Sequence, residues 1–173
     1  MTISKLALSP VQSLLKRSFD FLVAFAGLIA VWWLILIAYI AATLDTRSSG
    51  FFIQTRVGKG GRVFKVVKIK TMRPDDKTTT TVTQSGDPRI TPLGAFFRKT
   101  KIDELPQLWN VLLGQMSFVG PRPDVPGYAD RLEGEDRAVL SLRPGITGPA
   151  TLKYRGEEEI LAAQDDPEQP LIS

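Results

Sequence analysis

The chain has 173 residues and a net charge of +4, and it contains neither cysteine nor histidine. This composition excludes disulfides, thiol nucleophiles, imidazole bases and the usual zinc sites, so that acid and base chemistry falls to Asp, Glu, Lys or Tyr. Any metal is expected to be a hard, oxygen-binding ion such as magnesium or manganese.

Charge is distributed unevenly along the chain. Basic residues predominate up to Lys101 and acidic residues predominate from Ile102 onward. The basic part would attract anionic lipid heads or phosphate-bearing substrates. Since no recognisable nucleic-acid motif accompanies it, we expect no nucleic-acid partner.

The first predicted element is an apolar segment without a charge at residues 21–44. As a helix it would extend about 36 Å, more than the roughly 30 Å of a bilayer's hydrocarbon core. The segment is longer than the apolar region of a cleaved signal peptide, and it is apolar on every face, unlike a helix buried in a small soluble protein. Residues 1–46 are therefore predicted to anchor the chain in a membrane.

The sequence leaves open whether this segment spans the membrane or re-enters on the same side. Lys16 and Arg17 precede it and Arg47 and Arg56 follow it, so neither flank is clearly non-cytoplasmic. No proline interrupts the segment and nothing else in it enforces a kink. A re-entrant helix and a straight span both remain possible.

Two strands are predicted next, at residues 51–57 and 62–71, because both are rich in β-branched and aromatic residues. The glycine-rich stretch at 58–61 reads as a hairpin turn, since the spacing of a phosphate-binding loop is absent. Lys68 and Lys70 alternate onto one face and are expected to be solvated or lipid-facing first and substrate-binding second. The polar tract at 78–83 is typical of a loop.

An acidic pair, Asp103 and Glu104, precedes Pro106 and a run of apolar residues at helical spacing that ends at Gly114. The pair is therefore predicted to lie at a helix N-terminus, where unpaired N–H groups should keep both carboxylates ionised and where a phosphate could dock. Arg98 lies just upstream and would offset the repulsion. The simpler alternative is that Asp103 is only a helix cap.

A Gly-Pro-Arg-Pro turn follows this helix. Pro121 and Pro123 stiffen the backbone around Arg122, which favours a bidentate contact of the guanidinium with phosphate. The alternative is an ordinary solvated turn residue.

Four motifs in this order resemble one family. They are the membrane segment entered by Lys16, Arg17 and Asp20; FFIQTRVGKGGRVFKVVKIKTM at 51–72; DPRITPLGAFFRKTKIDELPQLWNVLLGQMSFVGPRP at 87–123; and RPGITGPATLKYR at 143–155. From about Lys16 to Arg155 the chain is similar to the small monotopic phosphoglycosyl transferases of bacteria.

The resemblance implies transfer of a sugar 1-phosphate from a UDP-sugar to a membrane polyprenyl phosphate such as undecaprenyl phosphate, with release of UMP and with Mg²⁺ as cofactor, Mn²⁺ being possible. Asp103 matches the family's nucleophile and metal ligand, and Glu104 its partner. Arg98 and Arg122 match residues that contact phosphate and nucleotide, with Pro121 and Pro123 beside them. Such a reaction would be the first membrane step of glycoconjugate assembly.

The implied fold is α+β and mostly helical, with a membrane helix, a β-hairpin and interfacial amphipathic helices. A catalytic domain at 47–156 would lie on the cytosolic face of the bacterial inner membrane. Residues 157–173 form an acidic tail that looks short beside many family members. Two alternatives remain: a catalytically inactive membrane anchor or assembly partner with the same fold, and a soluble sugar-nucleotide enzyme.

Overall fold

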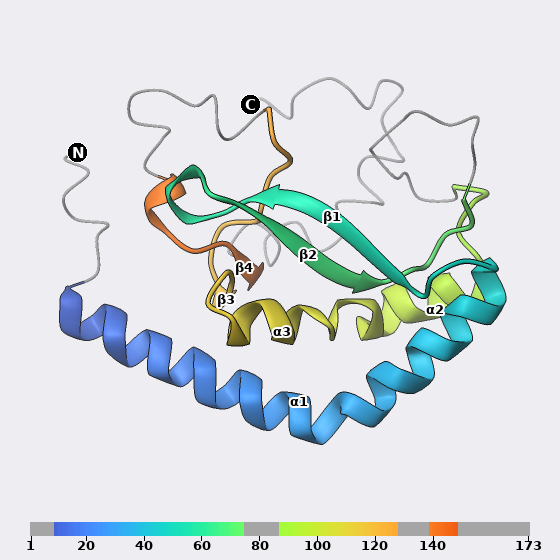
Figure 1. Ribbon diagram of the computed structural model, residues 1–173, viewed down its shortest axis with the longest axis horizontal. Coiled ribbons are helices and arrows are strands. Elements are labelled where there is room, and N and C mark those ends of the chain that lie inside the picture. The colour runs from blue at the N-terminus through green and yellow to red at the C-terminus, as the bar shows by residue number, and fades with distance from the viewer. Residues whose placement is uncertain (1–8, 75–86, 128–138, 149–173) are drawn as a thin grey trace.

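The computed structural model describes residues 9–74, 87–127 and 139–148. The polar tract at 78–83 and the acidic tail at 157–173 lie outside these residues. A long N-terminal helix runs along one side of a small unit of helices and strands (Figure 1). The elements, in order, are α1 (Pro10–Thr46), β1 (Phe51–Val57), η2 (Lys59–Gly61), β2 (Val63–Ile69), α2 (Pro92–Thr100), η3 (Ile102–Glu104), α3 (Gln107–Leu112), β3 (Ser117–Val119) and β4 (Gly145–Thr147), where η marks a short 3₁₀ helix. The predicted mixture of helix and sheet is confirmed.

Helix α1 contains the predicted apolar segment and begins well before it. Its first turn is fixed by a capping box, in which the Ser9 hydroxyl accepts from the Gln12 amide at 3.2 Å and the Gln12 side chain accepts from the Ser9 amide at 3.0 Å. Pro10 at the first helical position lacks the N–H that would otherwise be unpaired. The helix ends at Arg47, which adopts the left-handed conformation with φ of 51°.

Most of α1 is exposed. Only 11% of its most apolar stretch is buried, and Trp32 and Trp33 are 60% and 51% exposed. Within the described residues, α1 is the helix that is long and apolar enough to cross a membrane. The low burial argues against the core helix of a soluble protein, the alternative that the sequence also disfavoured.

Helix α1 is bent near its middle, so that both ends rise toward the same side and α3 lies in the concave side (Figure 1). The indole N–H of Trp33 donates to the Ala30 carbonyl at 2.8 Å, an oxygen that a regular helix uses for the amide four residues on. Gly27 lies beside Leu108 of α3, since a Cβ at Gly27 would make an ordinary van der Waals contact of 3.4 Å with the Leu108 Cδ1 atom. The helix thus bends without proline.

The β-hairpin is confirmed. Strands β1 and β2 are antiparallel, from Phe51 opposite Ile69 to Val57 opposite Val63, and β2 is shorter than predicted at both ends. Gly60 and Gly61 have φ of 70° and 78°, values that favour glycine. Because a strand follows the turn, the hairpin interpretation holds and a phosphate-binding loop does not.

Two apolar clusters join α1 to the rest of the fold. One contains Ala24, Phe64, Val66, Val111 and Met116, and the other contains Ala38, Ala42, Ile69 and Phe97. The members from α1 are alanines, which let the strands and short helices approach its backbone closely.

Polar residues near the start of α1 also face the small unit, although the sequence presented them as charges at the entry to a membrane. Asp20 is 2% exposed, and its carboxylate accepts from the Ser117 hydroxyl at 2.9 Å and pairs with Lys16 at 3.3 Å. Lys16 also donates to the Ser117 hydroxyl. Arg17 donates to the carbonyls of Val111 and Leu112 at the end of α3, both at 2.7 Å.

Candidate active site

The acidic pair lies in η3, the turn between α2 and α3. The turn begins at Lys101, which has φ of 60° and also ends α2. The amides of Glu104 and Leu105 bond the carbonyls three residues earlier, both at 3.2 Å, and Pro106 caps α3. The prediction that the pair opens the apolar helix is therefore wrong in detail: a separate 3₁₀ turn holds both acids, and the helix begins at Gln107.

Asp103 is buried, with 8% of its surface exposed. Within the described part of the chain its Oδ1 atom has no hydrogen-bond partner and its side chain forms no cap, so the capping alternative is wrong. Burial, and then the charge of Glu104, raise the pKa of the Asp103 carboxyl from 3.8 to about 6, against the opposing charges of Lys68, Lys101 and Arg98. The pKa of Asp103 thus lies above its ordinary value, but it still leaves this carboxyl mostly ionised at neutral pH, in line with the prediction.

Glu104 faces two lysines. Its Oε1 atom lies 3.6 Å from the Lys68 Nζ atom and 3.9 Å from the Lys101 Nζ atom. Lys68 comes from β2, where it lies opposite Phe52 near the open end of the hairpin. The Lys68 side chain remains 34% exposed, as expected of a partly solvated residue, and its ammonium group also pairs with Glu104. Lys70 donates to the Ser48 hydroxyl at 2.9 Å.

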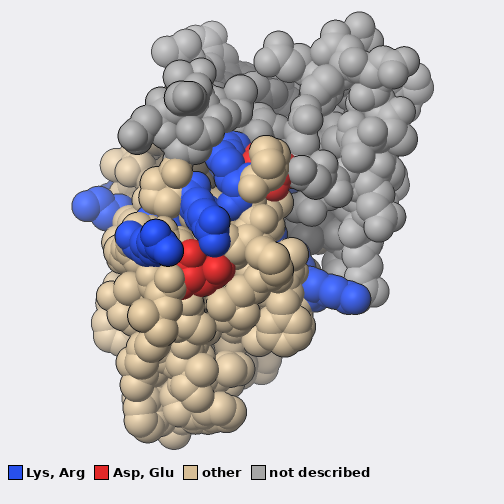
Figure 2. Space-filling model, turned by 90° about the vertical axis from the view of Figure 1, so that its right-hand side faces the viewer, with Lys and Arg blue, Asp and Glu red and all other residues tan. Residues whose placement is uncertain are grey.

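Arg98 belongs to the same cluster. It lies in the last turn of α2, and its guanidinium is steadied by the Thr71 hydroxyl at 3.0 Å and by the Met72 sulfur at 3.3 Å. At Gly94, α2 lies so close to the end of the hairpin that a Cβ would overlap the Thr71 carbonyl. Figure 2 shows lysines and arginines gathered around a small acidic area on the face of the molecule where α2 lies.

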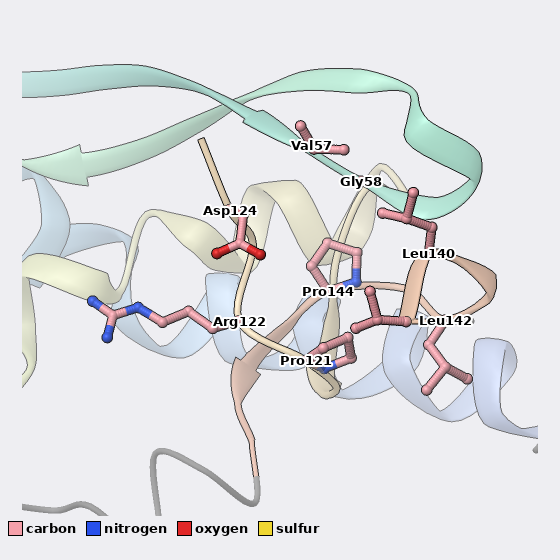
Figure 3. Close-up of a pocket in the computed structure, with 9 residues that line it drawn as sticks. Val57, Gly58, Pro121, Arg122, Asp124, Leu140, Leu142 and Pro144 are labelled. Carbon is pink, nitrogen blue, oxygen red and sulfur yellow. The ribbon is translucent and has the colours of Figure 1, made fainter. Parts of the chain in front are cut away.

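Arg122 lies in a second cluster. The charges that act on Asp103 are those of Glu104, Lys68, Lys101 and Arg98, whereas Arg122 acts on Arg56 of β1. Arg122 is exposed, and Figure 3 shows its side chain pointing away from the apolar residues Leu140 and Leu142. The structure thus brings three of the predicted site residues together and places Arg122 beside a residue that the sequence did not single out.

The turn around Arg122 borders a small cavity of about 20 Å³ lined in part by Pro121, Gly58 and Pro144 (Figure 3). That volume is enough for about one water molecule and far too small for a nucleotide. The carbonyls of Pro121 and Pro123 accept hydrogen bonds within the fold. Pro121 accepts from the Gly145 amide at 2.8 Å, and Pro123 accepts from Arg56 at 3.1 Å. Their predicted contact with substrate stays a prediction.

The segment at 143–148 lies beside this turn because β4 pairs in parallel with β3. The close approach of these two segments needs glycine, since a Cβ at Gly120 or at Gly145 would overlap the backbone of the other segment. Arg143 donates to the Gly114 carbonyl at 3.1 Å.

The acidic pair fits a magnesium site with few protein ligands. Within the described residues no three Asp or Glu side chains gather to hold a metal. Mg²⁺ is often bound by one or two carboxylates together with substrate phosphates and water. Asp103, whose Oδ1 atom has no hydrogen-bond partner among the described residues, and the neighbouring Glu104 supply such a pair.

Two functional candidates were undervalued or missed in the sequence. Lys68 carried a weak signal, its alternation on the strand, and Arg56 carried none beyond its charge. Both lie on the hairpin, far along the chain from the residues that they meet.

Comparison with known proteins gives one consistent result. The model of a family described as bacterial sugar transferase matches residues 11–166. A Bacillus subtilis protein, provisionally named undecaprenyl-phosphate N-acetylgalactosaminyl 1-phosphate transferase, is 43% identical over 83% of this chain and 79% of its own length. The exopolysaccharide production protein PSS of Rhizobium leguminosarum is 40% identical over 80% of this chain and 74% of its own.

A third relative is the UDP-glucose:undecaprenyl-phosphate glucose-1-phosphate transferase of Escherichia coli, which is 38% identical over 89% of this chain. The match covers only 34% of that longer protein. The shared part contains both clusters of candidate site residues.

Proposed function

Because the chain belongs to the bacterial sugar transferase family, we propose that this transferase moves a sugar 1-phosphate from a UDP-sugar to a polyprenyl phosphate through a covalent intermediate on Asp103. The single observation that carries the proposal is the buried carboxylate of Asp103, whose Oδ1 atom lacks a partner within the described residues while lysine and arginine charges surround it. The relatives' names, which include undecaprenyl phosphate and UDP-glucose, support the substrate classes.

In the first step an oxygen of Asp103 attacks the phosphorus that is linked to the sugar. The bond from this phosphorus to the UMP oxygen breaks, so that UMP leaves and an acyl phosphate remains on the side chain. A pKa of about 6 leaves the carboxylate mostly ionised at neutral pH while making it more basic than an ordinary aspartate. Its attack therefore needs no separate base.

In the second step an oxygen of the polyprenyl phosphate attacks the same phosphorus. The bond to Asp103 breaks, which restores the carboxylate and forms a polyprenyl diphosphate sugar. Three anionic groups meet in these steps, and the cationic side chains of Lys68, Lys101 and Arg98 offset their repulsion. Glu104 keeps two of these cations in place through its ion pairs.

A magnesium ion, or manganese, would be held by Asp103 and Glu104 together with substrate phosphate. When bound, it would neutralise phosphate charge and polarise the oxygens of the diphosphate. The cationic side chains around the acidic pair orient the UDP-sugar donor. The fold keeps the acidic pair directly after the end of α2.

The bent α1 supports a re-entrant anchor at the inner membrane. Both ends of α1 lie on one side of the bend (Figure 1), so a chain that entered the bilayer there would return to the cytosolic face. Phe96 of α2 and Trp109 and Leu113 of the α3 region are each more than half exposed, as interfacial helices would require. The acidic pair would then lie at the height of the lipid phosphates.

The test is release of UMP by the purified chain given Mg²⁺, polyprenyl phosphate and each of a panel of UDP-sugars. Asp103→Asn should abolish release, whereas the same change at Asp45, in the last turn of α1, should not. With radiolabelled donor and no acceptor, label should stay on the wild-type chain and be removed by hydroxylamine, which cleaves acyl phosphates. Turnover by Asp103→Asn would refute the nucleophile, and a wild-type chain inactive with every donor would favour the inactive anchor.

A further inference from the structure

Strand β1 carries a half-buried arginine, Arg56, whose guanidinium is fixed on two sides. Its Nε and Nη2 atoms donate to the Gln54 side-chain oxygen at 3.2 Å and 2.6 Å. Its Nη1 atom donates to the Pro123 carbonyl at 3.1 Å. One side chain therefore connects the hairpin to the turn that carries Arg122.

The backbone reinforces this connection. The Val57 amide donates to the Asp124 carbonyl at 2.9 Å, so two successive residues of β1 bind the two residues that follow Arg122. The turn is consequently held as a continuation of the hairpin rather than as a free loop.

Arg122 carries a second guanidinium at the same turn. Burial, and then the charge of Arg122, lower the pKa of Arg56, and the carboxylate of Asp124 opposes this effect. Arg56 is thus within electrostatic reach of Arg122. Phosphate fits a guanidinium group such as that of Arg122 especially well.

We propose that Arg56 is a positioning residue for substrate binding: it fixes the turn at 121–124 and so holds Arg122 in place to contact a phosphate of the nucleoside diphosphate donor. The identity of the anion rests on the proposed function. Arg56 acts through Arg122 and the turn, and it lies outside the cluster around Asp103.

The test compares three variants of the full chain in detergent. Arg56→Gln removes the charge and the fixed guanidinium, Arg56→Lys keeps the charge alone, and Arg62→Gln is the matched control, because it removes an exposed arginine from the same hairpin. UDP alone is the probe, titrated calorimetrically. We expect Arg56→Gln to weaken UDP binding about tenfold, Arg56→Lys to recover part of the loss, and Arg62→Gln to change it less than about twofold.

With UDP-sugar as substrate, Arg56→Gln should raise KM by a similar factor and leave kcat nearly unchanged, since Arg56 does not contact the acidic pair. UDP affinity within about twofold of wild type for Arg56→Gln would overturn the inference, as would an equal loss for Arg62→Gln. If Arg56→Gln fails to fold, Arg56→Lys decides, and wild-type affinity in that variant overturns the inference.

Binding of UDP separates this inference from the proposed function. A chain that binds UDP through Arg56 but never releases UMP would refute the proposed transfer and leave the inference standing. A chain that releases UMP but binds UDP equally well without Arg56 would do the reverse.

Discussion

Replacing Asp103 by Asn should stabilise the folded protein at neutral pH while abolishing its activity. The Asp103 carboxyl has a pKa of about 6 in the fold against an ordinary value of 3.8. Each pH unit between these values corresponds to about 1.4 kcal/mol. The ionised carboxylate therefore destabilises the folded state by about 3 kcal/mol at neutral pH, and the amide of Asn escapes this cost.

The raised pKa of Asp103 also determines how the free energy of unfolding changes with pH. Between pH 3.8 and about 6 the folded chain retains a proton on Asp103 that the unfolded chain has lost, so the wild-type free energy of unfolding falls as the pH rises through this window and is flat above it. The Asn variant lacks this fall. The free energy of unfolding of the Asn variant should exceed that of wild type by an amount that grows by about 2 kcal/mol from pH 4.5 to pH 8. This corresponds to about 4 to 8 °C in Tm for a chain of this size.

The assay is thermal unfolding of both proteins in detergent, without divalent cations, across this pH range. The decisive quantity is the change of the Tm difference with pH. The new amide N–H groups of Asn contribute equally to the difference at every pH, so their contribution cancels from this change. Asp45→Asn, made in parallel, should show no such trend. A Tm difference between Asp103→Asn and wild type that is equal at pH 4.5 and pH 8 would refute the assigned cost of ionising the buried carboxyl.

Three further predictions follow from single contacts. Lys68→Met should raise the pKa of Asp103 above about 6, because the Lys68 charge lowers it; the infrared band of the protonated carboxyl in metal-free protein measures this, and a lowered pKa would contradict it. Arg17→Met removes two bonds of 2.7 Å to backbone carbonyls and should lower the free energy of unfolding by about 2 to 4 kcal/mol, so an unchanged Tm would count against these bonds. Gly94→Ala should lower Tm more than Gly60→Ala, since a Cβ at position 94 overlaps backbone whereas position 60 is open and carries only the strain of a positive φ; the reverse order would be evidence against the close approach of α2.

Local patterns predicted much of the fold. The uncharged run at 21–44 predicted a long apolar helix, and the glycines at 58–61 predicted the hairpin turn, because both signals depend on residues that are near neighbours in the chain. The helix after Pro106 was placed nearly correctly. The 3₁₀ turn before it was missed, because propensity does not reveal where a short helix yields to a tighter one.

The sequence by itself determined which residue types are present for chemistry: an acidic pair, arginines before and after it, and a long apolar helix to hold them. The tertiary structure alone decided the burial that raises the pKa of Asp103, the approach of Lys68 to Glu104, the hydrogen bond from Arg56 to the turn that carries Arg122, and the bend of α1. Each of these arises between segments that are distant in the chain or from the exclusion of water. Spacing along the chain records neither, since both depend on how the hairpin, the short helices and α1 pack together.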